Sequence, residues 1–201
     1  IPNTVTHIGH SAFANCTSLT SIVIPNSVTA IYMYTFQGCS SLVDVTIPNS
    51  VTYIAGFAFD SCSSLEEIRI PNSITSINQR VFSNCTNLKS ITIPDSVTTI
   101  CCQAFEGSNN LKTITIPTSV TSIEVFAFSG CSGLTDIYYT GTEEQWSQIS
   151  IGDFNDKFLT ATVHYDPCAD GHSYGEDGVC TGCGEPDPDY VALAITPQPT
   201  D

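Results

Sequence analysis

Basic side chains are scarce in this chain. Its 201 residues include 20 Asp and Glu but only 5 Lys and Arg, which gives a formal net charge of −15. A surface that binds phosphates needs clustered Lys and Arg, so nucleic acids and anionic membranes are poor candidate partners. The imbalance is strongest after residue 138, where Lys157 is the single base among twelve acidic residues.

Long hydrophobic runs and catalytic motifs are also missing. No stretch approaches the roughly 18 apolar residues that a membrane span needs, so we expect no membrane insertion. The chain begins inside a repeat at Ile1 and has no signal peptide, which indicates a piece of a longer protein. It contains no G-x-S-x-G motif, phosphate-binding loop or pair of catalytic acids. We therefore expect no enzymatic activity.

What the sequence does contain is a strict period of 23 residues. The dipeptide Ile-Pro starts at residue 1 and returns at residues 24, 47, 70, 93 and 116. Three apolar columns run through all six copies, namely Phe13 to Phe128, Leu19 to Leu134 and Ile8 to Ile123. One such unit cannot bury its apolar side, whereas stacked units make a continuous interior. The period therefore predicts a solenoid.

Each unit contains signals for two extended segments and two turns. The stretch L-x-x-I-x-I-P reads as a short strand that the proline ends, because proline cannot donate a hydrogen bond to a sheet. Asn26 and Ser27 predict an Asx-type or Ser-type turn, and V-T-x-I predicts a second extended piece. Phe13 and Cys16 are three residues apart, which suits one helical or 3₁₀ turn.

The full unit, as in residues 24–46, reads IPNSVTAIYMYTFQGCSSLVDVT. This pattern resembles the BspA-like leucine-rich repeats, a 23-residue class found in bacterial cell-surface proteins. The resemblance covers residues 1–138 and implies a right-handed superhelix of short parallel strands with turns or 3₁₀ segments. It also implies an extracellular location, at the cell surface or secreted, and adhesion to a host protein, matrix or glycan. We expect a monomer.

The repeat stops at Tyr139, and residues 139–166 predict a cap of helix and strand over the last coil. Residues 142–145 carry a capping-box signature, and Trp146 and Ile149 follow three residues apart. We expect Trp146 to plug the last coil rather than to serve as a ligand platform. Residues 161–165 alternate like a final strand. Residues 167–201 form an irregular acidic tail.

Five of the ten cysteines share one column of the repeat, and Ser108 occupies the sixth place; they are Cys16, Cys39, Cys62, Cys85 and Cys131. A disulfide needs Cβ vectors that point at each other, whereas stacked side chains point the same way. Buried cysteine also behaves as a small hydrophobic residue. We therefore predict core thiols rather than disulfides or metal ligands, and interpret Cys101 and Cys102 as drift at tolerant positions.

The tail has a different cysteine pattern, formed by Cys168, His172, Cys180 and Cys183. Three thiolates and one imidazole match the ligand set of a structural zinc, and a metal could hold together a segment with almost no apolar residues. A flexible tail whose thiols are idle or disulfide-linked is the alternative.

Two surface columns are candidates for ligand contact. The outward strand positions are rich in Thr and Ser and include Arg69 and Tyr138. The resemblance makes this the concave, ligand-contacting side, although threonine is also simply a good strand residue. The second column precedes the Ala-Phe pair and contains Tyr34, Phe57, Arg80 and Phe126.

Together with Tyr32, this second column predicts an aromatic stripe that contacts protein or carbohydrate. Partial burial against neighbouring coils is the alternative. We expect Tyr34 and Phe57 to be more than a third exposed. The sequence as a whole predicts an adhesive binding scaffold, with a passive spacer that displays another domain as the alternative.

Overall fold

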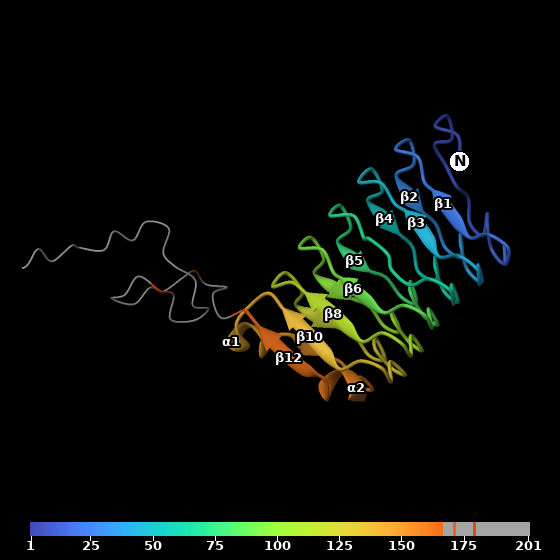
Figure 1. Ribbon diagram of the computed structural model, residues 1–201. Helices are drawn as coiled ribbons and strands as arrows, with labels where there is room; N and C mark the ends of the chain where they lie inside the picture. Colours follow the sequence, from blue (N-terminus) through green and yellow to red (C-terminus); the bar gives the residue numbers. More distant parts are fainter. Residues whose placement is uncertain (167–170, 172–178, 180–201) are drawn as a thin grey trace, which may run out of the picture.

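The computed structural model is a solenoid of stacked coils (Figure 1), and it describes residues 1–166 together with Gly171 and Val179. One side, here called the long-strand face, carries parallel strands of three or four residues. These are β1 (Ser21–Val23), β3 (Asp44–Thr46), β6 (Ser90–Thr92), β8 (Thr113–Ile116), β10 (Asp136–Tyr139) and β12 (Thr162–Tyr165). None of the helices in this described part is long and apolar enough to cross a membrane.

A second side, the short-strand face, carries strands of two residues each. These are β2 (Ala30–Ile31), β4 (Tyr53–Ile54), β5 (Ser76–Ile77), β7 (Thr99–Ile100), β9 (Ser122–Ile123) and β11 (Ser150–Ile151). Paired residues within the repeats are 23 positions apart, as in Ser21 opposite Asp44 and Ser76 opposite Thr99. The sequence period is therefore the register of the paired strands on both faces, as the solenoid prediction requires. Each face is interrupted once: β2 and β4 form one short-strand sheet, and β5, β7, β9 and β11 form another.

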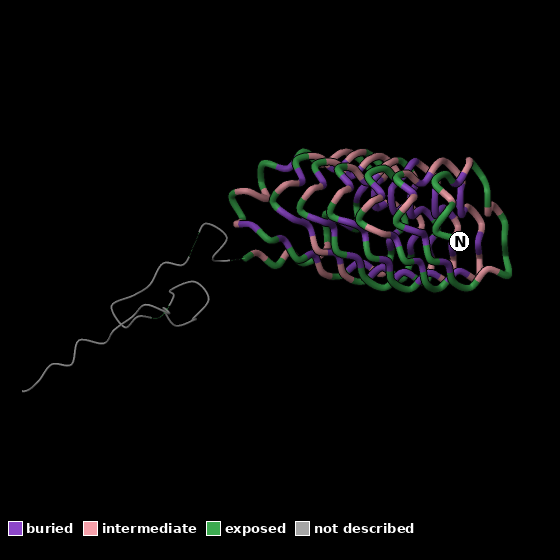
Figure 2. The backbone as a smooth tube through the Cα atoms, turned by 90° about the horizontal axis from the view of Figure 1, so that it is seen from above, coloured by how far each residue is buried: buried purple, intermediate pink, exposed green. Residues whose placement is uncertain are grey.

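The core lies between the two faces and runs the length of the solenoid, where Figure 2 shows the buried backbone on the inside of each coil. Its centre is a pile of phenylalanine rings, from Phe13 through the repeats to Phe128. Successive rings have centroids 5.2 to 5.8 Å apart and are inclined by 8 to 18°. Such offset stacks of aromatic rings add to the free energy of area burial. The Leu and Ile columns enclose this pile.

The cysteine column forms a ladder of hydrogen bonds between coils. Each thiol donates to the carbonyl of the phenylalanine in the preceding coil; the pairs are Cys39 to Phe13 at 3.0 Å, Cys62 to Phe36 at 3.1 Å, Cys85 to Phe59 at 3.3 Å and Cys131 to Phe105 at 3.1 Å. Ser108 donates in the same way to Phe82, at 2.9 Å. This shared bond explains why serine substitutes here for cysteine, since both supply a short side chain with a donor.

The prediction of core thiols is confirmed for these four cysteines, which are fully buried. Loss of solvation on burial raises the pKa of the Cys62 and Cys85 thiols, and raises the pKa of Cys131 to about 12. The prediction is wrong for Cys16, which is exposed in the first coil and makes none of the thiol bonds of the ladder. All seven cysteines of the described part are free thiols.

The serine of the Pro-Asn-Ser turn acts between coils as well. Ser27 donates to the carbonyl of Val5 at 2.6 Å, and Ser119 donates to that of Val97 at 2.8 Å. Ser50, Ser73 and Ser96 make the equivalent bonds. The sequence predicted a local turn at this position, and the structure shows that the hydroxyl is used across the coil boundary. It satisfies a carbonyl that the short strands leave without a partner.

The last coil is covered by two short helices, α1 (Glu143–Trp146) and α2 (Asp156–Leu159), with β11 and β12. Helix α1 has the predicted capping box between Thr142 and Gln145. The ring of Phe158 extends the phenylalanine pile, with its centroid 4.4 Å from that of Phe128. Trp146 packs against Phe158 and Tyr139. The aromatic pile therefore ends beneath an indole ring instead of in water.

Candidate binding surfaces

The long-strand face contains a hollow of about 840 Å³ over the second to fourth coils. Its lining includes Asp44, Thr46, Glu67, Arg69 and Thr92, all of which are exposed. These are the outward positions of three successive coils. The solenoid thus brings side chains that are 23 residues apart in sequence to the walls of one depression.

The hollow coincides with an interruption of the sheet. In the third coil, residues 67–70 form no strand, so β1 and β3 are separated from β6, β8, β10 and β12. The unit repeat predicted a strand in every coil, and this coil departs from the prediction. Regular pairing would place Glu67 directly opposite Asp44, a like-charge pair that destabilises a sheet. Long charged side chains are also poor strand formers compared with threonine.

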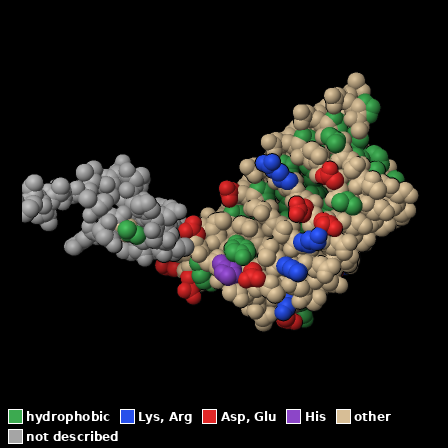
Figure 3. All heavy atoms as spheres, viewed as in Figure 1, with side chains coloured by type: hydrophobic (Ala, Val, Ile, Leu, Met, Phe, Trp, Pro, Cys, Tyr) green, Lys and Arg blue, Asp and Glu red, His purple; other side chains and the backbone are tan. Residues whose placement is uncertain are grey.

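Charge is concentrated on this face. Three of the five basic residues of the chain lie on this face. Arg69 is in the coil without a strand, and Lys89 and Lys112 directly precede β6 and β8. Lys89 binds Glu66 of the preceding coil, with 2.5 Å between Nζ and Oε2. Arg69 makes no ion pair with any residue of the described part. In Figure 3, acidic and basic side chains gather across the middle of the visible face.

The C-terminal end of the same face presents a small polar cluster. The Tyr138 and His164 rings are stacked, with centroids 4.8 Å apart, and both residues are exposed. Nε2 of His164 lies 2.7 Å from Oδ1 of Asp136. That hydrogen bond is the main reason why the pKa of the Asp136 carboxyl is lowered. The stacked rings and the carboxylate together place a phenol hydroxyl, an imidazole and an acid at one end of the face.

Apart from Tyr32, the residues of the predicted aromatic stripe lie at the edge of the short-strand face, three residues after a two-residue strand. Tyr34 and Phe57 are in contact, with ring centroids 5.1 Å apart, and both are half-buried. Neither residue is among the exposed large hydrophobic side chains, so both fit the alternative interpretation, partial burial against neighbouring coils. Tyr32 is packed against His7 and His10 of the first coil. The structure therefore separates Tyr32 from the pair that it was predicted to join.

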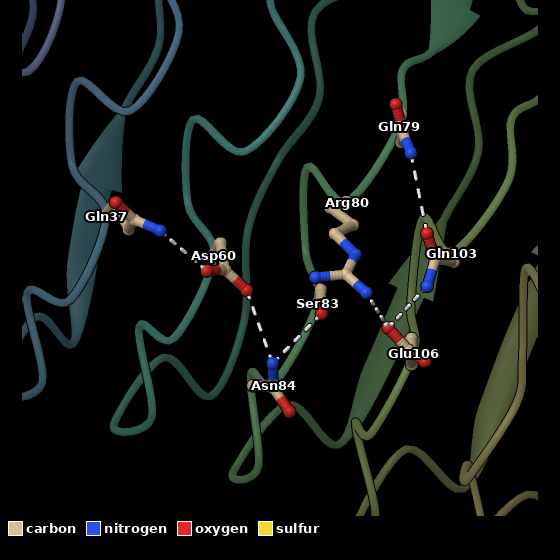
Figure 4. A network of polar contacts seen from close by, with 8 residues as sticks. All are labelled: Gln37, Asp60, Gln79, Arg80, Ser83, Asn84, Gln103 and Glu106. Carbon is tan, nitrogen blue, oxygen red and sulfur yellow. Dashed lines mark hydrogen bonds and ion pairs between the residues drawn. The ribbon is translucent and has the colours of Figure 1, made fainter.

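Arg80 connects this stripe to a polar network (Figure 4). Its guanidinium carbon lies 5.6 Å from the centroid of the Phe57 ring, and Nη2 is 3.1 Å from Oε2 of Glu106. Glu106 also accepts a hydrogen bond from Nε2 of Gln103 at 3.0 Å. The predicted residues thus fall into two groups. Arg69 and Tyr138 lie on the long-strand face, while Tyr34, Phe57, Arg80 and Phe126 lie along one ridge.

Two residues of the cap were not found from the sequence. Asn155 is fully buried, and its Oδ1 accepts a hydrogen bond from the backbone N–H of Phe128 at 2.9 Å. Phe154 stacks on Phe126, with centroids 4.4 Å apart and rings inclined by 3°. A signal for Phe154 does exist, because Ile151 pairs with Ile123 and each is followed three residues later by phenylalanine.

The predicted zinc ligands, Cys168, His172, Cys180 and Cys183, lie outside the described residues. Within the described part, no group of three or more His, Cys, Asp and Glu residues is placed to hold a metal ion. Cys101 and Cys102 are half-buried, and Sγ of Cys101 lies 3.3 Å from Oγ of Ser76.

Comparison with known proteins agrees with this geometry. A family model described as "BspA type Leucine rich repeat region" matches residues 1–100 and 57–162 in six copies. The chain therefore belongs to the BspA-type leucine-rich-repeat family. No curated protein matches it.

Several solved structures share the fold. A leucine rich cell surface protein from Faecalibacterium prausnitzii A2-165 is 42% identical, with a TM-score of 0.63, over 65% of this chain and 34% of that one. The T. pallidum leucine rich repeat protein is 31% identical, with a TM-score of 0.65, over 71% of this chain and 64% of that one. A leucine-rich repeat protein from Bacteroides ovatus is 29% identical, with a TM-score of 0.58, over 82% and 54%. The chain thus spans between about a third and two thirds of these relatives.

Proposed function

We propose that the chain is an extracellular binding scaffold of a bacterial surface protein, and that its long-strand face holds a partner protein of the host or matrix. The observation that carries this proposal is the hollow at the interrupted third coil. There Asp44, Glu67 and Arg69 project from neighbouring coils without an ion pair among the described residues. Family membership and a relative named as a cell surface protein support the location.

Charged groups that no neighbour neutralises are suited to a partner with the opposite charge pattern. Complementary charges steer encounter and select among partners more than they add to affinity. The strand gap adds to the same region main-chain groups of residues 67–70 that neither β3 nor β6 pairs. A protein partner can supply both charged side chains and backbone donors and acceptors.

An array of host and matrix proteins probed with the full chain tests this function. We expect at least one protein to be retained, and its binding to weaken as salt rises. Arg69→Glu should reduce the affinity tenfold or more, about 1.4 kcal/mol. Lys157→Glu is the matched control, because Lys157 is an exposed base in α2, away from the hollow. It should leave binding unchanged.

Two results would contradict the proposal. If Arg69→Glu binds the partner as tightly as the parent chain does, the hollow is not part of the interface. Retention of no protein by the repeats, while a neighbouring domain of the full-length protein binds, would favour the passive spacer instead.

A further inference from the structure

The ridge that follows the short strands has an unusual backbone. Its residue in each coil has a positive φ of 54 to 62°; the seven residues are Ser11, Tyr34, Phe57, Arg80, Gln103, Phe126 and Phe154. This is the left-handed region, which Cβ sterics make unfavourable for all residues but glycine and, less strongly, asparagine. The cap repeats the feature, because Phe154 is the equivalent of Phe126 one coil later.

The solenoid does use the favoured residues at a neighbouring left-handed position. Four residues on in each repeat, the φ values are again positive, and Asn15, Gly38, Asn84, Gly107 and Gly130 occupy most of these places. Phenylalanine and tyrosine on the ridge therefore adopt a backbone conformation that asparagine or glycine would adopt at less cost, although neither of these occurs at the ridge position. Strained positions of this kind are concentrated at functional sites.

Four of the ridge residues make two aromatic platforms. Tyr34 and Phe57 form the first, and the guanidinium of Arg80 lies against its end. Phe126 and Phe154 form the second, in which the rings are nearly parallel and Phe154 is 58% exposed. Phe57 and Phe126 are three coils apart, or about 14 Å at the spacing of paired strands.

The ridge between the platforms is polar and close to neutral. Arg80 is paired with Glu106, and Gln103 donates to the same carboxylate. Nε2 of Gln79 lies 3.4 Å from Oε1 of Gln103. In Figure 4, Gln79, Gln103 and Glu106 follow one another, and Arg80 reaches Glu106 from the side. They offer both donors and acceptors at the surface, without the unpaired charges that mark the long-strand face.

We propose that this ridge is a second binding site and that it takes a neutral polysaccharide. Each sugar ring has an apolar C–H face, which can lie on an aromatic ring, and a rim of hydroxyls that donate and accept hydrogen bonds. Two platforms joined by amides and a neutralised ion pair match a chain of such rings along the solenoid. The site is separate from the hollow assigned to a protein partner.

The left-handed backbone makes a clean test possible. Asparagine tolerates this conformation, as Asn15 and Asn84 show. Phe57→Asn and Phe154→Asn should therefore remove a ring without straining the chain. The full chain and each variant are run in native gels that contain a soluble β-glucan, xylan or galactomannan. We expect at least one polysaccharide to retard the parent chain.

Each of the two variants should weaken binding to that polysaccharide tenfold or more. Phe154→Asn, which removes an exposed ring, should keep a melting temperature no lower than that of the parent. Arg69→Glu, in the hollow, should be retarded normally, so this result can hold even if the proposed protein partner is never found. Absence of retardation by all three polysaccharides, or unchanged retardation of both variants, would overturn the proposal. The ridge would instead be assigned to a protein partner if no polysaccharide binds and the ridge variants fail to bind a protein on the array that the parent chain retains.

Discussion

Replacement of Asn155 by alanine should destabilise the last coil strongly. The side chain accepts the N–H of Phe128 at 2.9 Å and donates to the carbonyls of Glu124 at 3.0 Å and Gly152 at 2.8 Å. In earlier coils the equivalent N–H is bonded by a backbone carbonyl, as Phe105 N–H is by Ala127. The amide of Asn155 thus substitutes for a peptide group that the cap cannot supply.

The loss of folding free energy can be worked out from the hydrogen-bonding groups that the substitution leaves without a partner. A buried donor without an acceptor costs about 1–3 kcal/mol, and the Phe128 N–H is in that position. The two carbonyls lie nearer the surface and can recover water, at roughly 0.5 kcal/mol each. We expect a total loss of about 3 kcal/mol, a large part of the 5–15 kcal/mol typical of a domain.

Urea unfolding followed by circular dichroism measures this loss, and amide hydrogen exchange localises it. The Phe128 amide should exchange much faster in Asn155→Ala, while amides in the second coil keep their protection. Asn26→Ala is the matched control, because Asn26 is exposed in a turn, and it should cost little. A change below about 0.5 kcal/mol for Asn155→Ala, within the range of ordinary surface substitutions, would refute the view that its side chain replaces a backbone partner.

Three further predictions concern the thiol ladder and the polar cluster. Cys85→Ser should cost less than Cys85→Val in urea unfolding, because only serine keeps a donor for the Phe59 carbonyl; equal costs would contradict the ladder. In the folded chain, iodoacetamide followed by mass spectrometry should label exposed Cys16 and spare Cys85, whose pKa burial raises; labelling of both would contradict this burial. By NMR, Asp136 should titrate below the usual pKa of 3.8, and His164→Ala should raise that pKa, because the His164 hydrogen bond is the largest cause of the lowering; an unchanged pKa would contradict this. Stability from this bond is present above pH 3.8 and is lost as pH falls through the lowered pKa.

Much of the fold could be predicted because the same pattern of apolar residues and turn residues occurs in six consecutive repeats. The Phe column was predicted to be buried, since no single coil could hide its rings alone. It is fully buried from Phe36 to Phe128, while Phe13 in the first coil is partly buried. The capping box of α1 was equally local and was predicted from Thr142 and Gln145. The cysteine column could be assigned to the core from parallel stacking. Its bond to the Phe carbonyl could not, because that bond joins residues 26 positions apart.

The candidate surfaces depend on contacts between coils that the sequence alone does not show. The column pattern named Arg69 and Tyr34, but it treated every coil alike and so missed the strand that fails at residues 67–70. The short-strand face is interrupted at the same level, between β4 and β5. The left-handed backbone of the ridge and the place of Phe154 beside Phe126 also went unpredicted from residue types.

The sequence by itself determined the solenoid, its register and its core, because period and burial are both properties of the repeated unit. Tertiary structure alone decided where the repeat departs from itself. It places a hollow beside Asp44 and Glu67, and it holds aromatic rings on a ridge with a left-handed backbone. In the last coil, the side-chain amide of Asn155 replaces a backbone hydrogen-bond partner. These are contacts between coils, and their energies depend on which side chains meet rather than on which follow one another in the chain.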